Sequence, residues 1–315
     1  RHAIPGERVE VAITGEGNGG KYLRADAIRV VDASAHRRTA PCPYAGPDKC
    51  GGCDYQHGTP EHQRDLKRDV VIDALKRQGK FTDDEISALN ISVVDLGDDL
   101  GWLTRVRYST HNGSFAMRKH RSHDLVDVAY CPLGVPQLHD VTDVPTAAEV
   151  ELIAGPTLTV VANGHVIAGP TKQVRHAAGR EYKVSGAGFW QVHRKAPEVL
   201  IDHVVAGLAP KAGDHILDLY AGVGLFAGAL ASQVGPGGRI DVVESSEQAC
   251  TDAKRNLHDV EIARINHADV TSWLKHSAPS RCDLVIIDPP RSGAGPAVME
   301  RLTKLKARTL VYVAC

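Results

Sequence analysis

Residues 215–224 read His-Ile-Leu-Asp-Leu-Tyr-Ala-Gly-Val-Gly, and this stretch decides the fold of the C-terminal part of the chain. Its apolar run predicts a buried strand, and the helix-forming segment 225–234 follows the two closely spaced glycines. Glycines at such a turn let the backbone approach a ligand closely and point the N-terminus of the next helix at it. The stretch therefore predicts a strand, a ligand-binding turn and a helix.

The alternation of strand and helix continues to the C-terminus. Further strands are predicted at 239–244, 262–266, 284–288 and 309–313, and further helices at 246–259 and 296–305, with a short helix before the fourth strand. This alternation is typical of a parallel sheet with helices on its faces. The predicted fold class is therefore α/β, with a Rossmann-like domain whose parallel sheet has at least five strands.

The end of the second predicted strand carries a carboxylate. Glu244 stands 22 residues after Gly222, which suits a carboxylate that binds two ribose hydroxyls. Phe226 and Ala227 occupy the region of the third glycine of a dinucleotide-binding fingerprint, which favours a single nucleoside with a small charged tail over NAD. An ordinary tight turn is the alternative for the glycines alone. The predicted cofactor is S-adenosylmethionine.

Two more strand ends carry carboxylates, and ligands collect at that edge of a parallel sheet. Asp269 follows the third strand, and Asp288 opens the sequence Asp288-Pro289-Pro290-Arg291 after the fourth. Because each proline fixes its own φ, this turn is rigid and presents a carboxylate and backbone carbonyls to a planar base. A purely structural turn is the alternative, and its position beside the predicted cofactor favours function.

Four of the seven cysteines have a metal-ligand pattern: Cys42, Cys50 and Cys53 share one Gly- and Pro-rich loop, and Cys131 is available as a fourth ligand. The odd cysteine count argues against a disulfide framework. Four thiolates suit zinc or an iron–sulfur cluster. Zinc usually binds two paired Cys-x2-Cys hooks, whereas three ligands crowd one loop here. We expect a [4Fe–4S] cluster, with zinc or four unrelated buried cysteines as the alternatives.

The charge is balanced overall, with a net charge of -1, but its distribution is uneven. Segment 101–125 carries Arg105, Arg107, Arg118, Lys119 and Arg121 against Asp124, and segment 171–195 carries six basic residues against Glu181. Local basic stretches can form a phosphate-binding face, and a solvated surface is the alternative. No apolar run approaches the roughly 20 residues of a membrane-spanning helix.

Three domains are predicted. Residues 1–38 contain two strands, which cannot form an independent domain; residues 39–182 contain the cysteine loop, a helix at 60–78 and a mainly β region; residues 183–315 form the Rossmann-like domain. The chain opens with Arg1 and His2 without an initiator methionine, so we expect it to be cut from a longer protein.

The chain resembles the RNA (uracil-5-)-methyltransferase family, in particular its iron–sulfur-containing ribosomal RNA 5-methyluridine branch. Seven segments in family order carry the resemblance: IPGERVEV at 4–11, PCPYAGPDKCGGCDYQH at 41–57, MRKHRSHDLVDVAYCPLGVPQL at 117–138, GFWQVH at 188–193, ILDLYAGVGLF at 216–226, IIDPPRSGA at 286–294 and VYVAC at 311–315. The resemblance implies S-adenosylmethionine-dependent methylation of carbon 5 of a uridine in RNA. It also implies that residues 1–38 are part of an OB-like, TRAM-type β-barrel.

The resemblance assigns residues to roles. Cofactor contacts would come from Gln191, Tyr220, Gly222, Gly224, Leu225, Glu244, Asp269 and Asp288, catalysis from Cys315 as nucleophile with Asp288 and Arg291, and cluster ligands from Cys42, Cys50, Cys53 and Cys131. The chain departs from the family pattern in places. Leu225 replaces an often polar residue, Ala314 replaces the usual Ser, and seven residues separate Cys42 from Cys50. The family's general-base glutamate would lie beyond Cys315.

Several alternatives remain open at this point. One is 5-methyluridine formation in transfer RNA, another is a methyltransferase that acts on cytosine or a small molecule, and a third is a non-catalytic iron–sulfur RNA-binding protein. The expected partner is RNA, with ribosomal RNA favoured over transfer RNA. We expect no membrane partner, no obligate protein partner and a cytoplasmic monomer.

Overall fold

The structure is a computed structural model that describes residues 1–314; Cys315 lies outside the described residues. The chain divides into two compact units. Unit 1 comprises Arg1–Gly101 and Arg107–Val150, and unit 2 comprises Trp102–Val106 and Glu151–Cys315. Within residues 1–314, no helix combines the length and the apolar character that crossing a lipid bilayer requires.

Unit 1 begins with an antiparallel hairpin of β1 (Arg8–Gly17) and β2 (Tyr22–Asp32). Its outer ends are tied by Glu7, whose carboxylate binds the Arg37 guanidinium at 2.5 Å and the Ile4 amide at 2.8 Å. In the described residues these strands form a two-stranded sheet, and no closed barrel is present. Several apolar side chains of the hairpin are exposed, among them Ile13, which is 64% exposed.

A helical segment follows the cysteine loop. It consists of α1 (Pro60–Ala74), the π-helical turn η1 (Leu75–Gly79) and α2 (Asp83–Ala88). The predicted helix at 60–78 is therefore present, with a π turn at its end. Helix α2 was not predicted, although Thr82 and Glu85 carry its signal: the Glu85 amide donates to the Thr82 hydroxyl, and the Thr82 amide donates to the Glu85 carboxylate.

The rest of unit 1 contains antiparallel strands, as the mainly β prediction required. Strand β3 (Arg105–His111) pairs with β4 (Ser114–Arg118), and β4 pairs with β5 (Leu125–Asp127). A short 3-10 helix, η2, spans Pro136–Leu138. The buried residues here include Tyr108 and Phe115, whose rings are stacked with centroids 4.5 Å apart, together with aliphatic side chains such as Val128 and Leu138.

Five strands precede the parallel sheet of unit 2: β6 (Glu149–Ile153), whose first two residues belong to unit 1, β7 (Thr159–Ala162), β8 (His165–Ala168), β9 (Lys172–Ala177) and β10 (Arg180–Ser185). Strand β7 pairs antiparallel with β8. Strands β9 and β10 form a tight hairpin in which Ala177 lies opposite Arg180. Its two turn residues, Ala178 and Gly179, both have positive φ, as two-residue hairpin turns require.

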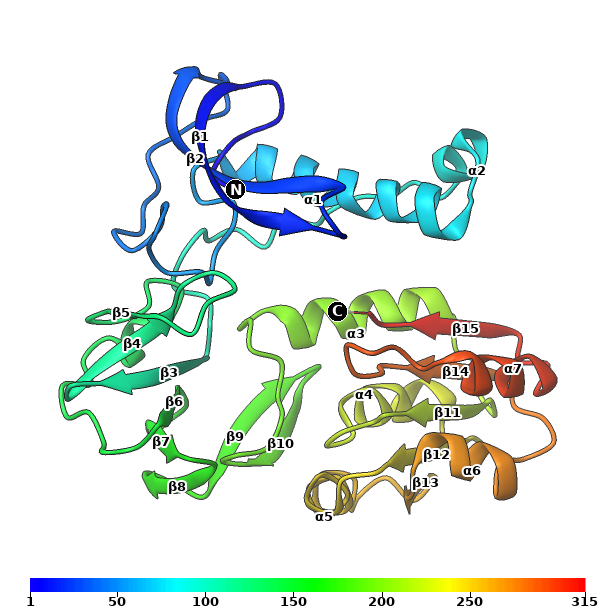
Figure 1. Cartoon of the computed structure of the whole chain (residues 1–315). Helices are drawn as coiled ribbons and strands as arrows, with labels where there is room; N and C mark the ends of the chain where they lie inside the picture. Colours follow the sequence, from blue (N-terminus) through cyan, green and yellow to red (C-terminus); the bar gives the residue numbers. More distant parts are fainter. Residues whose placement is uncertain (315) are drawn as a thin grey trace. The chain divides into compact units, whose positions relative to one another are not determined.

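The Rossmann-like sheet of unit 2 is parallel and has five strands in the order β13-β12-β11-β14-β15 (Figure 1). These are β11 (His215–Leu219), β12 (Arg239–Glu244), β13 (Ala263–His267), β14 (Leu284–Ile287) and β15 (Thr309–Tyr312). The sheet confirms the predicted α/β fold. The strand order reverses between β12 and β14, on either side of β11.

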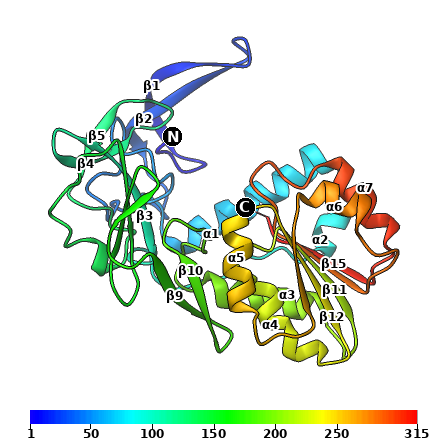
Figure 2. The same ribbon diagram turned by 90° about the horizontal axis from the view of Figure 1, so that it is seen from below.

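Five helices cover the two faces of this sheet: α3 (Ala196–Leu208), α4 (Leu225–Val234), α5 (Glu247–Asn256), α6 (Val270–His276) and α7 (Pro296–Lys304). Helices α3 and α4 lie on one face, and α6 and α7 lie on the other (Figure 2). Alternate strand residues serve each face: Ile216 and Ile286 pack toward α3 and α4, whereas Leu217 and Ile287 pack toward α6 and α7. Both faces are buried, as a parallel sheet requires.

Candidate active site

The register of the sheet brings the strand ends to one edge. The Asp288 amide donates to the Leu219 carbonyl at 3.3 Å, and the Ala268 amide donates to the Glu244 carbonyl at 2.9 Å. The ends of β11, β12, β13 and β14 are therefore level. Because the strand order reverses at β11, this edge is where a parallel α/β sheet binds its ligand.

Glycine is required at the two positions of the turn after β11 for different structural reasons. Gly222 has a φ of +55°, and a Cβ there would meet no atom within 4 Å, so its backbone faces open space. Gly224 has a φ of +85°, and a Cβ there would lie 2.8 Å from the side chain of Leu257. Gly222 therefore leaves room for a ligand, and Gly224 allows close packing at the start of α4.

Glu244 is held by the loops around it. Its carboxylate accepts from the Gly222 amide at 2.9 Å and from the Ser246 amide at 2.7 Å. An ionised carboxylate has about four lone-pair sites, so these two bonds leave acceptor capacity for hydroxyl groups. The structure thus places Glu244 directly beside the glycine turn, as the strand-end argument predicted.

Asp218 is a buried carboxylate that the sequence analysis missed. It is 1% exposed, one oxygen accepts from the Ala227 amide at 2.9 Å, and the other has no hydrogen-bond partner among residues 1–314. Burial raises the pKa of Asp218 to about 7, and the charges of Asp288 and Glu244 act in the same direction. Strongly perturbed carboxyl groups concentrate at functional sites. The signal in the sequence was an Asp inside an otherwise apolar strand.

The predicted catalytic residues after β14 have different surroundings. Asp288 is half-buried at the strand end, and burial raises its pKa. Arg291 is exposed in the turn that follows, which the Gly293 amide closes by donating to the Pro290 carbonyl at 2.8 Å. The structure therefore places Asp288 at the ligand edge and Arg291 on the adjacent surface. Cys315, the predicted nucleophile, lies outside the described residues.

Three more predicted cofactor residues lie near the same edge. Tyr220 has a φ of +61°, and burial raises its pKa, followed by the charge of Asp269. Asp269 caps α6 by accepting from the Ser272 amide at 2.9 Å. Leu225 is buried at the start of α4, and its carbonyl accepts from the Tyr182 hydroxyl at 3.0 Å. Asp269 thus has a structural role whether or not it binds a ligand.

Gln191 lies in a loop between β10 and α3 that is fixed by its neighbours. Arg105 donates to the Gly188 carbonyl at 2.7 Å, and the Thr104 amide donates to the Val192 carbonyl at 2.7 Å. Tyr182 connects this loop to the glycine turn. Its ring lies 5.5 Å from the ring of Trp190 in the loop, and its hydroxyl donates to the carbonyl of Leu225, which follows the turn.

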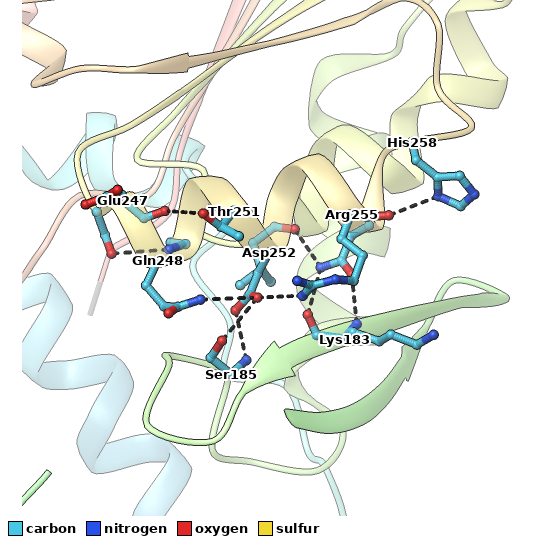
Figure 3. Close-up of polar contacts among 12 residues, drawn as sticks. Lys183, Ser185, Glu247, Gln248, Thr251, Asp252, Arg255 and His258 are labelled. Carbon is cyan, nitrogen blue, oxygen red and sulfur yellow. Dashed lines mark hydrogen bonds and ion pairs between the residues drawn. The ribbon is translucent and has the colours of Figure 1, made fainter. Parts of the chain in front are cut away.

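A polar network joins the β9–β10 hairpin to α5 (Figure 3). Asp252 accepts from the Ser185 amide at 2.8 Å, and Asn256 accepts from the Lys183 amide at 2.8 Å. Asn256 also donates to the Val223 carbonyl at 3.1 Å, inside the glycine turn. These long-range contacts leave no mark in the local sequence pattern, which is why the sequence analysis missed them.

The four cysteines of the predicted metal site lie in unit 1, and their backbones are tied together. The Gly51 amide, next to Cys50, donates to the Arg118 carbonyl at 2.9 Å, and the Cys131 amide donates to the Tyr108 hydroxyl at 2.9 Å. Tyr44, two residues after Cys42, accepts from the Ala129 amide at 2.9 Å, two residues before Cys131. The loop and Cys131 are thus held beside each other.

The thiols are close enough to influence one another electrostatically. Burial raises the pKa of Cys53, and the charges of Cys50 and Cys42 add to it; burial likewise raises the pKa of Cys131 to about 11, with Cys53 and Cys50 adding to it. Among residues 1–314, no three His, Cys, Asp or Glu side chains are spaced to hold a single metal ion. Thiolates on one zinc lie within about 4 Å of one another.

The first predicted basic stretch lies next to this loop. Arg118 and Arg121 are exposed, whereas Lys119 pairs with Asp48 at 2.6 Å. These three basic residues and Cys50 line a hollow of about 520 Å³ in unit 1. The cysteine loop and the basic stretch therefore share one surface.

Comparison with known proteins agrees with this site. The methyltransferase small domain family matches residues 193–311. A Streptomyces avermitilis protein described as an uncharacterized RNA methyltransferase is 38% identical over 100% of this chain and 82% of its own length. A 23S rRNA (uracil(1939)-C(5))-methyltransferase from Halomonas elongata is 27% identical over 99% of this chain and 75% of its own length.

The fold has a solved counterpart. The crystal structure of Pyrococcus abyssi tRNA (uracil-54, C5)-methyltransferase, in complex with S-adenosyl-L-homocysteine, has a TM-score of 0.74 and 20% identity. The similarity covers 100% of this chain and 85% of that chain, so both units take part in it. Together with the parallel sheet and the carboxylates at its ligand edge, these relatives show that the chain belongs to the RNA (uracil-5-)-methyltransferase family.

Proposed function

We propose that this chain transfers the methyl group of S-adenosylmethionine to carbon 5 of a uridine in ribosomal RNA. The observation that carries the proposal is the ligand edge of the five-stranded sheet. There the Glu244 carboxylate accepts from the Gly222 amide at 2.9 Å, and the space beside the Gly222 backbone is open. The preference for ribosomal over transfer RNA rests on the ribosomal RNA enzyme from Halomonas elongata, which matches nearly the whole chain.

The residues at this edge fit the cofactor. Glu244 would bind the ribose hydroxyls through its remaining lone pairs, and Gly222 would allow the nucleoside to approach the backbone. Asp218, near the end of β11, is buried close to this edge, one of its oxygens has no hydrogen-bond partner among residues 1–314, and burial raises its pKa to about 7. The further contacts that we propose come from Gln191, Tyr220, Gly224, Leu225, Asp269 and Asp288, with Leu225 acting through its backbone. The cofactor supplies an electrophilic methyl group.

Carbon 5 of uracil is a poor nucleophile and needs activation. The Cys315 thiolate would add to carbon 6, which gives an enolate whose carbon 5 attacks the methyl group. Asp288 and Arg291 would position the ring and stabilise charge on its carbonyl oxygen. A downstream carboxylate would then remove the carbon-5 proton, and the thiolate would leave. The target base must first leave its stack, and the basic surface of unit 1 around Arg118 and Arg121 would help to hold the RNA for this step.

We further propose that Cys42, Cys50, Cys53 and Cys131 hold a [4Fe–4S] cluster. The proposal is supported by the hydroxyls of Tyr44 and Tyr108, which hold the segments around Cys42 and Cys131, and by the mutual charges of the thiols, which add to the raised pKa of Cys53 and Cys131. Anaerobically purified protein should then be brown with about four irons per chain. Colourless protein with one bound zinc would contradict the assignment.

The domain assignment is also part of the proposal. Residues 1–38 would be a fragment of a TRAM-type barrel, residues 39–182 the central domain and residues 183–315 the methyltransferase domain. The exposed apolar face of the β1–β2 hairpin, with Ile13 and Leu23 at 64% and 59% exposed, supports a fragment that has lost its packing partners.

The decisive experiment uses the full-length protein and labelled S-adenosylmethionine. Wild type should label ribosomal RNA and form a covalent adduct with RNA that contains 5-fluorouridine. Cys315→Ala should bind the cofactor normally and do neither. Cys282→Ala is the matched control, because Cys282 is buried at the opposite end of β14. Label in transfer RNA alone would identify transfer RNA, not ribosomal RNA, as the substrate. No label in any RNA would favour a non-catalytic RNA-binding protein.

The cofactor site has its own test. Glu244→Ala leaves ribose hydroxyls without an acceptor, a loss on the order of 1–3 kcal/mol in binding free energy. Calorimetry of S-adenosylmethionine binding measures it, with Glu247→Ala as control, since Glu247 lies on the first turn of α5 and is exposed. Equal affinities of wild type and Glu244→Ala would place the ribose elsewhere.

A further inference from the structure

Arg175 carries a charge on the inner face of the β9–β10 hairpin. It lies directly opposite Tyr182, a fully buried residue, and its neighbours on the same strand face, Gln173 and Ala177, are buried as well. The Nε atom of Arg175 is buried and has no acceptor among residues 1–314. The two terminal nitrogens are not among the buried unpartnered atoms and make no hydrogen bond within these residues, so they are not fully buried.

The surroundings of Arg175 contain more positive than negative charge. Arg105 is close, but it is neutralised by Glu151, to which its Nε donates at 2.9 Å. Burial first and the charge of Arg105 second lower the pKa of Arg175, and no carboxylate of the described residues opposes them. Arg180 on the same hairpin shows the contrast, because its guanidinium binds Asp259 at 2.6 Å. Arg175 is thus a half-buried cation without an anion.

The cavity beside Arg175 is too small to hold a ligand. It has a volume of about 10 Å³, and its walls include Arg105, Ser185, Gly188 and Trp190. An anion must therefore reach the terminal nitrogens, which are not fully buried, from outside this cavity. Gly188 and Trp190, which line this cavity together with Arg175, belong to the loop that also carries Gln191, so Arg175 lies beside the proposed cofactor loop.

We propose that Arg175 binds a phosphate group of the RNA strand next to the target nucleotide. A guanidinium matches the geometry of an oxyanion with two parallel hydrogen bonds, which explains Arg rather than Lys at this position. An unpaired charge in a half-buried place is unfavourable until an anion arrives, so the site is built for a bound state. This assignment rests on the proposed function, since that function supplies the RNA. The carboxylate of the cofactor is the alternative oxyanion that could occupy this site, and the test below distinguishes the two.

The test compares Arg175→Gln with wild type in the full-length protein, using a single-stranded oligouridylate as the probe. Loss of one charge-assisted contact should weaken RNA binding roughly tenfold at low salt. The slope of log K against log salt concentration should become shallower by about 0.7, the value for one phosphate of a single strand. The matched control is Arg264→Gln, which removes one exposed positive charge from edge strand β13 and should leave both quantities near wild type.

A second measurement separates binding from a structural role. Arg175→Met keeps the volume and removes the unpaired charge, so it should raise the unfolding temperature of the free protein while it weakens RNA binding. A structural arginine would lower the unfolding temperature instead. Arg175→Lys should bind RNA with intermediate strength, since it retains the charge and loses the paired geometry.

Three outcomes overturn the assignment. The first is an unchanged salt slope for Arg175→Gln, the second is a lower unfolding temperature for Arg175→Met, and the third is weaker binding of S-adenosylmethionine with unchanged RNA binding, which would give the site to the cofactor carboxylate. The proposed function fails separately, when wild type transfers no methyl group to RNA. If wild type methylates RNA and any of the three outcomes is found, the assignment of Arg175 is wrong and the proposed function stands.

Discussion

The Rossmann-like sheet and the N-terminal region with the cysteine loop are held in different ways. In the sheet, Ile216, Leu284 and Ile286 are fully buried, and each such side chain contributes about 1.5–3 kcal/mol. In the hairpin, Ile13 and Leu23 are mostly exposed, and polar ties such as the Glu7–Arg37 ion pair hold the chain. The sheet is stabilised by its own buried side chains, whereas the N-terminal hairpin exposes much of its apolar surface and is held by polar contacts.

The largest effect should come from the cysteine loop. Cys53→Ser removes one proposed ligand of the cluster, and structural metal sites contribute on the order of 10 kcal/mol to the folding of their segments. In anaerobic full-length protein, hydrogen exchange of residues 42–57 should become fast, while β11 and β14 keep their protection. Cys282→Ala is the control. Unchanged protection of the loop would show that it folds without a metal, and the contrast with the sheet would disappear.

The second prediction compares two isoleucines. Ile286→Ala leaves a cavity in the middle of the sheet and should lower the free energy of unfolding by about 2–5 kcal/mol. Ile13→Ala on the exposed hairpin should change it by less than about 0.5 kcal/mol. Urea unfolding followed by the fluorescence of Trp273, which packs in the sheet core, measures both. A large effect at Ile13 would reveal that the hairpin face is covered in solution.

The third prediction concerns pH and Asp218. Its pKa is raised from 3.8 to about 7 by burial, so between these values the folded protein holds a proton that the unfolded chain has released. Stability should therefore fall as pH rises from about 4 to about 7. At 1.36 kcal/mol per pKa unit, the upper bound of this loss is roughly 4 kcal/mol.

Asp218→Asn removes this titration. Without cofactor, the variant should gain stability over wild type as pH rises from about 4 to about 7, and the difference should vanish near pH 4. Asp202→Asn, an exposed position on α3, should show no such trend. Chemical unfolding at several pH values gives the comparison. A difference that is constant across this range would mean that Asp218 is ionised throughout, with a cation or water beside it.

The same contrast explains how far the sequence could be read. The strands and helices of the sheet were predictable because apolar runs such as 284–287 have to be buried on both faces, and the carboxylates at 244 and 288 follow from the strand ends. The contacts of Asp252 and Asn256 were not predictable, because they depend on residues about seventy positions away that only the folded chain brings together. Arg175 belongs to a basic stretch that the sequence does mark, but its lack of an acidic partner among residues 1–314 is visible only in the fold. Helix α2 was predictable from its capping box but was overlooked.

The smallest expected effect tests whether the β9–β10 hairpin and the glycine turn after β11 are structurally coupled. Tyr182→Phe removes only the buried hydroxyl that donates to the Leu225 carbonyl at 3.0 Å, so the loss in unfolding free energy should be about 1 kcal/mol. Because Leu225 begins α4 directly after Gly224, the same substitution should also weaken S-adenosylmethionine binding by a factor of a few. Tyr22→Phe in the N-terminal hairpin is the control, since that side chain is 53% exposed. Chemical unfolding and calorimetry measure the two quantities. If stability falls and cofactor affinity does not, the β9–β10 hairpin supports the sheet without positioning the turn, and contacts such as those of Arg105 and Thr104 suffice to fix the loop that carries Gln191.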